Sequence, residues 1–413
     1  MRTILSILFL TLALFAKERV VLEYWIPFSG GDARPMQFIV DKFNASQQET
    51  TVTMHVIEWA KYYPKLLEAL AAGTPPDIAI VHASKLAQFK SLDGLVNLSS
   101  FDKEVAFEWE DFSPWIREAV TFDKNYYAVA LDRYLLMTYY NKRYLKEVGL
   151  LDANGTLKAP IGEAQTLRFF HKIKTYLPSK ITALGQPIDN VFPFWIWYSL
   201  YHQIEGGGAY IEDNKAAFNN ASALKALQFL TRLRDEGIYA KPINDIQGYN
   251  MFKFEKSAVM LTGVWATWNF EQNEALDFGV APFPQVFDKP AAMSDSHTLV
   301  LPKNAHQPSH ERQIAAAAFA NFVSHHGIDW SLAGHIPART SLQNDEAYLK
   351  HSSRSRYKNY LDMGIAYPKH PQLGRCNDAL VTIFARMMQS DQTAQEALTE
   401  ALAAVNTILA TNP

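Results

Sequence analysis

Residues 71–82, AAGTPPDIAIVH, decide the fold. The helical run 62–72 ends at Gly73, because glycine tolerates the positive φ of a helix C-cap. Two prolines follow and cannot continue the helix. The next run, 77–81 (DIAIV), is apolar enough to be a strand buried on both faces, as strands of parallel sheets are. His82 ends this strand, so the stretch predicts a helix, a tight return and a buried strand.

The segments before this stretch repeat the same alternation. Residues 20–25 (VVLEYW) and 51–56 have the pattern of strands. Residues 33–45 place apolar side chains three and four positions apart, which indicates a helix. Strand, helix, strand, helix and strand in this order predict a doubly wound α/β fold.

Three side chains follow the expected carboxyl ends of the strands. Trp25 ends the first strand, Ser29 lies in the turn after it, and His82 ends the third strand. Ligands of open α/β sheets bind beyond these ends. We therefore expect a ligand site at this edge of the sheet.

Size and composition narrow the function. The 413 residues favour two domains, and 48% hydrophobic with 20% charged residues is typical of globular proteins. A net charge of −3 gives no reason to expect a nucleic-acid partner. The sequence has no G-x-S-x-G, H-E-x-x-H, P-loop or C-x-x-C motif, so we expect no enzyme, cofactor or metal.

The first 16 residues have the pattern of a secretory signal peptide. Arg2 precedes a mainly apolar run, 4–15, which is shorter than the roughly 20 residues that span a bilayer. Cleavage is expected near Ala16; an uncleaved membrane anchor is the alternative. Cys376, the only cysteine, cannot form an internal disulfide. An exported, cysteine-poor chain is expected in the periplasm.

Several stretches resemble a known family in the family's order. The chain is similar to extracellular solute-binding proteins of ABC importers, in the maltose-binding-protein-like, sugar-binding branch. The resemblance covers nearly the whole chain after the signal peptide. The stretches that carry it are 71–82, 127–150 (YAVALDRYLLMTYYNKRYLKEVGL), 254–265 (FEKSAVMLTGVW), 278–285 (FGVAPFPQ), 334–341 (GHIPARTS) and 394–409.

The resemblance implies a two-lobed α/β periplasmic-binding-protein fold with a ligand cleft between discontinuous lobes. The expected amino-terminal lobe is 17–131 plus 297–325, and the other lobe is 132–296 plus 326–413. Three crossing segments form the hinge, and we place them near residues 130–133, 294–297 and 324–328.

The resemblance also implies a function. Such a receptor captures a sugar, here a di- or oligosaccharide, by closing around its hinge. It then delivers the sugar to the permease subunits of the importer, and we expect it to act as a monomer. Aromatic rings pack on the C–H faces of a sugar, and planar polar groups bind its hydroxyls. The implied ligand-binding residues are Trp25, Ser29, Tyr63, His82, Asp132, Phe194, Trp195, Trp265, Asp295 and Arg339.

Two alternatives stay open from the sequence. The same fold could bind an anionic solute such as a polyol phosphate, which would need basic residues around Arg339. A carbohydrate-active enzyme could use Asp132 and Asp295 as a carboxylate pair, since glycosidases place two carboxyl groups roughly 5 to 9.5 Å apart.

Overall fold

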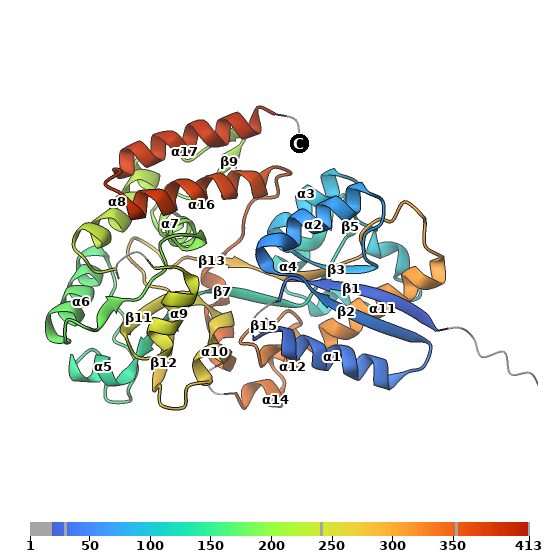
Figure 1. Ribbon diagram of the computed structural model, residues 1–413, viewed down its shortest axis with the longest axis horizontal. Helices are drawn as coiled ribbons and strands as arrows, with labels where there is room; N and C mark the ends of the chain where they lie inside the picture. Colours follow the sequence, from blue (N-terminus) through green and yellow to red (C-terminus); the bar gives the residue numbers. More distant parts are fainter. Residues whose placement is uncertain (1–18, 29–30, 240–242, 352–353, 412–413) are drawn as a thin grey trace, which may run out of the picture.

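The structure is a computed structural model that describes residues 19–28, 31–239, 243–351 and 354–411. The predicted signal peptide and Ser29 lie outside the described residues. Two mixed sheets organise the described chain, and each is covered by helices (Figure 1). No helix in the described ranges is both long and apolar enough to cross a membrane.

The first sheet has the strand order β2-β1-β3-β14-β6. β1 runs parallel to β2 and β3, whereas β14 is antiparallel to β3 and β6. Helices α1 and α11 pack on one face, and α2 and α3 pack on the other. The elements are β1 (Val20–Ile26), α1 (Ala33–Ser46), β2 (Thr50–Val56), α2 (Trp59–Ala71), β3 (Ile78–His82), η1 (Ala83–Lys85), α3 (Leu86–Ser91), η2 (Leu98–Phe101), η3 (Trp109–Asp111), α4 (Pro114–Val120), β4 (Thr121–Phe122), β5 (Asn125–Tyr126), β6 (Val129–Ala130), β14 (His297–Val300), α11 (His310–His325) and α12 (Gly327–Ser331).

The strands and helices predicted before residue 82 are therefore confirmed to within a few residues. All five residues of β3 are buried, as the apolar run predicts.

The second sheet has the order β16-β13-β7-β11-β8, and β12 and β15 also pair with β7. Its core includes side chains from α7, α8, α16 and α17, which lie together at the upper left of Figure 1. The remaining elements are β7 (Asp132–Asn141), α5 (Lys142–Glu147), α6 (Glu163–Tyr176), β8 (Thr182–Leu184), α7 (Val191–Gln203), β9 (Ile211–Glu212), β10 (Lys215–Ala216), α8 (Ala221–Asp235), α9 (Asp245–Lys253), β11 (Ser257–Gly263), η4 (Val264–Ala266), α10 (Thr267–Glu271), β12 (Phe278–Pro282), β13 (Ala292–Asp295), β15 (Ile336–Pro337), α13 (Thr340–Gln343), α14 (Glu346–Leu349), α15 (Arg354–Tyr357), η5 (Lys358–Met363), β16 (Gly364–Ile365), α16 (Leu373–Gln389) and α17 (Ala394–Leu409).

The chain passes between the two sheets at neighbouring points. Leu131 separates β6 of the first sheet from β7 of the second, and Ser296 separates β13 from β14. A third segment brings β15 beside the start of β7. The amino-terminal lobe is expected to end at residue 325, but Trp330 and Ala338, which lie beyond it, also pack in the core of the first sheet. The exact lobe boundaries stay a prediction.

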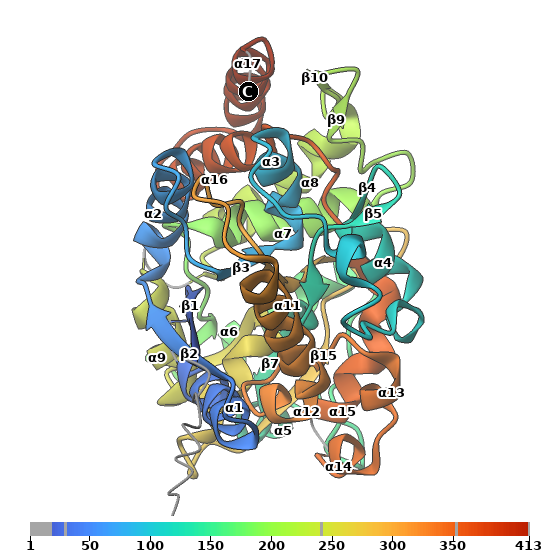
Figure 2. The same cartoon turned by 90° about the vertical axis from the view of Figure 1, so that its right-hand side faces the viewer.

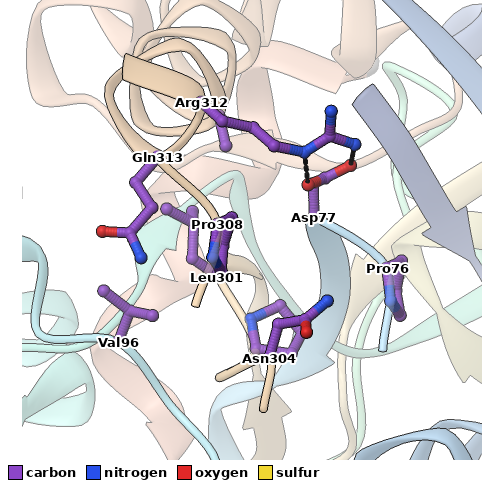
Figure 3. A pocket seen from close by; sticks show the side chains of 10 residues that line it. Pro76, Asp77, Val96, Leu301, Asn304, Pro308, Arg312 and Gln313 are labelled. Carbon is purple, nitrogen blue, oxygen red and sulfur yellow. Dashed lines mark hydrogen bonds and ion pairs between the residues drawn. The ribbon is translucent and has the colours of Figure 1, made fainter. Parts of the chain in front are cut away.

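Asp77, which precedes β3 at the end far from His82, connects three elements of the first sheet and its helices. Both carboxylate oxygens of Asp77 accept hydrogen bonds from Arg312 on α11, at 2.6 and 2.7 Å. Asp77 also accepts from the backbone N–H of Glu23 on β1 at 2.8 Å. Figure 3 shows this ion pair beside a hollow of about 20 Å³, which has room for little more than a water molecule. The proline–aspartate segment therefore has a structural role.

Asp77→Ala is expected to lower the free energy of unfolding by about 2 kcal/mol, because it leaves the half-buried Arg312 guanidinium and the backbone N–H of Glu23 without their acceptor. Urea unfolding of the two proteins measures this difference. Asp41→Ala, at an exposed position of α1, is the control and should change stability by less than about 0.5 kcal/mol. Equal effects of the two substitutions would contradict the role of Asp77.

Candidate ligand-binding site

A cavity of about 460 Å³ lies between elements of the two sheets. This volume is within the usual range of small-molecule sites. Pro27 and Phe28 line it just after β1, and His82 lines it at the end of β3. The cavity thus lies at the carboxyl ends of the parallel strands. Figure 2 shows α2 and α3 close to α16 at the top of the molecule, where η1 and α16 are in contact.

Aromatic rings of the second lobe form one wall of the cavity. Trp265 meets Trp195 edge to face at 5.6 Å and Tyr134 at 5.3 Å between ring centroids. The Trp265 indole N–H donates to the Tyr249 hydroxyl at 2.9 Å, which fixes the ring. A Cβ at Gly263 would lie 1.8 Å from the Trp265 ring, so only glycine lets the indole fold back over the end of β11. Phe194 and Trp195 of α7 also line the cavity.

His82 forms part of the opposite wall, and Tyr63 lies behind it. The Tyr63 hydroxyl accepts the backbone N–H of His82 at 3.0 Å and is hydrogen-bonded to Nδ1 of the same residue. Burial lowers the pKa of His82 well below its usual value, so the ring is neutral at pH 7. Tyr63 is not among the lining residues and positions His82 from behind.

Asp295 lines the cavity at the end of β13 and is 5% exposed. One carboxylate oxygen accepts the backbone N–H groups of Ser84 at 3.1 Å and Ser296 at 2.9 Å. Among the described residues it has no ion-pair partner. Burial raises its pKa to about 6, against an ordinary value of 3.8.

Asp295→Asn is expected to stabilise the ligand-free protein at pH 7. The raised pKa means that keeping Asp295 charged at pH 7 costs the folded protein about 3 kcal/mol. Asparagine removes this cost but weakens two hydrogen bonds, so the expected net gain in stability is about 2 kcal/mol. The folded protein holds the proton more tightly than the unfolded chain, so wild-type stability falls as pH rises from about 4 to about 6.

Thermal unfolding between pH 4 and pH 8 tests this expectation. The gain from Asp295→Asn should be full above pH 6 and should vanish near pH 4. A variant that is less stable than the wild type at pH 7 would contradict the assignment of Asp295 as a carboxylate without a counter-ion.

Asp132 does not face the cavity, which corrects the expectation from sequence. Its side chain is completely buried. One oxygen accepts the backbone N–H of His297 at 2.8 Å, and the other accepts His297 Nδ1 at 2.8 Å and Trp330 Nε1 at 2.6 Å. Burial acts to raise the pKa of Asp132, but the charges of His297 and His335 keep it below its usual value. Asp132 therefore positions His297, which does line the cavity.

The group Asp132, His297 and His335 also has the composition of a metal site, with ligand atoms within 4.8 Å of one another. The Asp132 oxygens, however, accept N–H donors at hydrogen-bond distances, and Trp330 supplies one of these donors. The geometry favours a hydrogen-bonded cluster over a metal centre.

Arg339 is also placed away from the cavity. Its guanidinium is fully buried and donates to the Phe107 carbonyl at 2.9 Å, to Asn321 Oδ1 at 2.7 Å and to Ser324 Oγ at 3.1 Å. These partners all belong to the first lobe's core region, so the expected cleft contact of Arg339 is corrected to a structural role.

Trp25 does not line the cavity either. Side chains alternate along a strand, so Trp25 lies on the face of β1 opposite that of Tyr24 and Ile26. It packs with the cluster around α2, and the Lys65 ammonium lies 5.0 Å above its ring. Ser29 lies outside the described residues.

Several lining residues were missed from the sequence. They are Asp32, Trp59, Lys85, Tyr134, Asp245, Tyr249, His335, Tyr367 and Asp378. Trp59 begins α2 just after the carboxyl end of β2, so the strand-end rule that indicates His82 would also have found it. Tyr367 lies between β16 and α16, and no local pattern marks it.

A model of the family described as bacterial extracellular solute-binding protein matches residues 39–352. The GacH receptor of Streptomyces glaucescens, solved without ligand and with acarbose, is 17% identical with a TM-score of 0.82, over 96% of this chain and 100% of that chain. Lmo0181 from Listeria monocytogenes, an ABC substrate-binding protein in complex with cycloalternan, gives the same four values.

UgpB from Mycobacterium tuberculosis, in complex with glycerophosphocholine, is 19% identical with a TM-score of 0.82, over 95% of this chain and 99% of that chain. These similarities confirm the predicted two-lobed α/β fold. The family match covers most of the chain, and the chain belongs to the family of bacterial extracellular solute-binding proteins.

Proposed function

We propose that this protein is the substrate-binding receptor of an ABC importer and that it captures a saccharide in the cavity. The observation that carries the proposal is the composition of the cavity. Aromatic rings of Trp195 and Trp265 offer flat apolar surfaces, and carboxylates such as Asp295 offer acceptors for hydroxyl groups. Binding of acarbose by GacH and of cycloalternan by Lmo0181 supports the same substrate class.

The mechanism that we propose is hinge closure. Leu131 and Ser296 lie at two adjacent crossings, and the cavity takes residues from both sides of them. A ligand that contacts both lobes binds the closed state better and shifts the population toward it. A micromolar dissociation constant corresponds to about −8 kcal/mol, which must exceed the cost of closing. Export through a cleaved signal peptide, a periplasmic location, a monomeric state and docking on permease subunits are parts of this proposal.

The alternatives are less favoured by the site. Lys85 is the one lysine or arginine among the described lining residues, which argues against an anionic solute even though the fold of UgpB is similar. Arg339, around which an anion site would have to form, is buried away from the cavity. The carboxylate pair that a glycosidase would use, Asp132 with Asp295, does not form, because Asp132 is buried against Trp330.

A thermal-shift panel on the protein from Lys17 onward tests the function. It covers neutral mono-, di- and oligosaccharides, amino sugars, polyols and polyol phosphates, because a ligand of the folded state raises the Tm by mass action. We expect a shift with saccharides. A shift with polyol phosphates alone would overturn the proposal in favour of an anion receptor.

A further inference from the structure

The charges around the cavity do not balance. Asp32 has a basic neighbour, since His335 Nε2 lies 3.9 Å from its carboxylate. Asp245, Asp295 and Asp378 also line the cavity, and none of these three forms an ion pair with another described residue. Lys85 is the one lysine or arginine among the described lining residues. His297 and His335 also line the cavity, but both lie within ion-pair distance of the buried Asp132. The cavity thus holds more carboxylate charge than its described lysine and histidines compensate.

Two of these carboxylates are poorly solvated. Asp295 is 5% exposed and accepts the backbone N–H groups of Ser84 and Ser296. Oδ1 of Asp245 is buried and has no hydrogen-bond partner among the described residues. Burial raises the pKa of both groups. A buried carboxylate without a counter-ion is costly, and a cation that enters the cavity would offset this cost.

The titratable groups around Asp295 offset its charge only in part. His82 lines the same cavity and is neutral. The His297 charge acts to lower the pKa of Asp295 against burial, but Nδ1 of His297 is directed toward Asp132. Tyr134 on β7 also lines this region. Burial and the Asp295 charge raise the pKa of Tyr134, so its hydroxyl remains protonated.

The aromatic wall adds a second attraction for cations. Trp195, Trp265 and Tyr134 meet edge to face, so their planes lie at steep angles to one another. Phe192 meets Trp195 in the same way at 5.5 Å. Ring faces attract cations, tryptophan most strongly. The same faces suit the C–H surface of a sugar ring.

From this juxtaposition of carboxylates and ring faces, we propose that the ligand is an amino sugar, a saccharide that carries a protonated amine. The ammonium lies near Asp295 or Asp245, and the sugar ring packs on the tryptophans. This inference rests on the proposed function and narrows its substrate class.

Calorimetry with matched disaccharides at pH 7 tests it. Chitobiose, cellobiose and N,N′-diacetylchitobiose share one skeleton and carry an ammonium, a hydroxyl or an amide at the same carbon. The same comparison is made with glucosamine and glucose, and with galactosamine and galactose. We expect the ammonium member of the best-binding set to bind at least about tenfold more tightly than its hydroxyl counterpart, as a charge-assisted hydrogen bond would give. Its affinity should also fall as salt is raised.

Variants locate the effect. Asp295→Asn and Asp245→Asn should each reduce the preference for the ammonium, and Asp41→Asn, on the exposed face of α1, should leave it unchanged. Equal or tighter binding of the neutral member would overturn the amino-sugar inference and leave the saccharide receptor standing. Binding of spermidine or choline without any saccharide would overturn the saccharide part. Binding of no saccharide, amino or neutral, would contradict both proposals.

Discussion

Replacing Trp265 with alanine is expected to weaken saccharide binding by about 100-fold while the protein stays folded. The indole is half-buried, lines the cavity and is held by the hydrogen bond to Tyr249. Its removal deletes a rigid apolar surface from the cavity wall, which affects the bound state more than the folded state. Calorimetry with the saccharide that gives the largest thermal shift measures the change in Kd.

Trp109→Ala is the matched control for this experiment. Trp109 is also half-buried, stacks on Tyr126 at 4.0 Å and lies outside the cavity lining. The Trp109→Ala substitution should lower the Tm about as much as Trp265→Ala does and should leave the Kd unchanged. Trp265→Phe should retain part of the affinity, because a flat ring remains. A Kd for Trp265→Ala within about twofold of wild type would remove Trp265 from the site.

The fold was readable from the sequence because its signals are local. Gly73, the two prolines and the apolar run 77–81 each act through their own backbone, and the structure has β3 where they predict it. The position of His82 follows from the strand that it ends, so a rule about sheet edges was enough to place it at the cavity.

The site was only partly readable because its contacts are remote. Asp132 and its partner His297 are 165 positions apart, and nothing in either segment shows that a neighbouring crossing strand buries the carboxylate. Arg339 likewise meets Phe107 across 232 positions. A charged residue at a hinge can face solvent, a ligand or a buried partner, and only the packing of the crossing segments distinguishes these environments.

Asp132→Asn is expected to lower the free energy of unfolding by about 4 kcal/mol, because it breaks a buried, hydrogen-bonded charge cluster. The amide oxygen can still accept one N–H, but the amide nitrogen then faces the donors of His297 and Trp330. This cluster joins the start of β7 to the start of β14 and to the third crossing segment, so its loss affects the whole hinge. Urea unfolding at pH 7 measures the effect, with exposed Asp41→Asn as the control.

The pH dependence of the Asp132→Asn effect separates a buried charge from ordinary packing. The folded-state pKa of Asp132 is below its usual value, so the stabilisation is complete above pH 4 and is lost as pH falls through that lower pKa. The difference between wild type and variant should therefore shrink in acid. A double variant with His297→Gln should lose less stability than the sum of the single variants, since both act on one hydrogen-bonded unit. Additive losses that do not change with pH would show that Asp132 acts only by filling space.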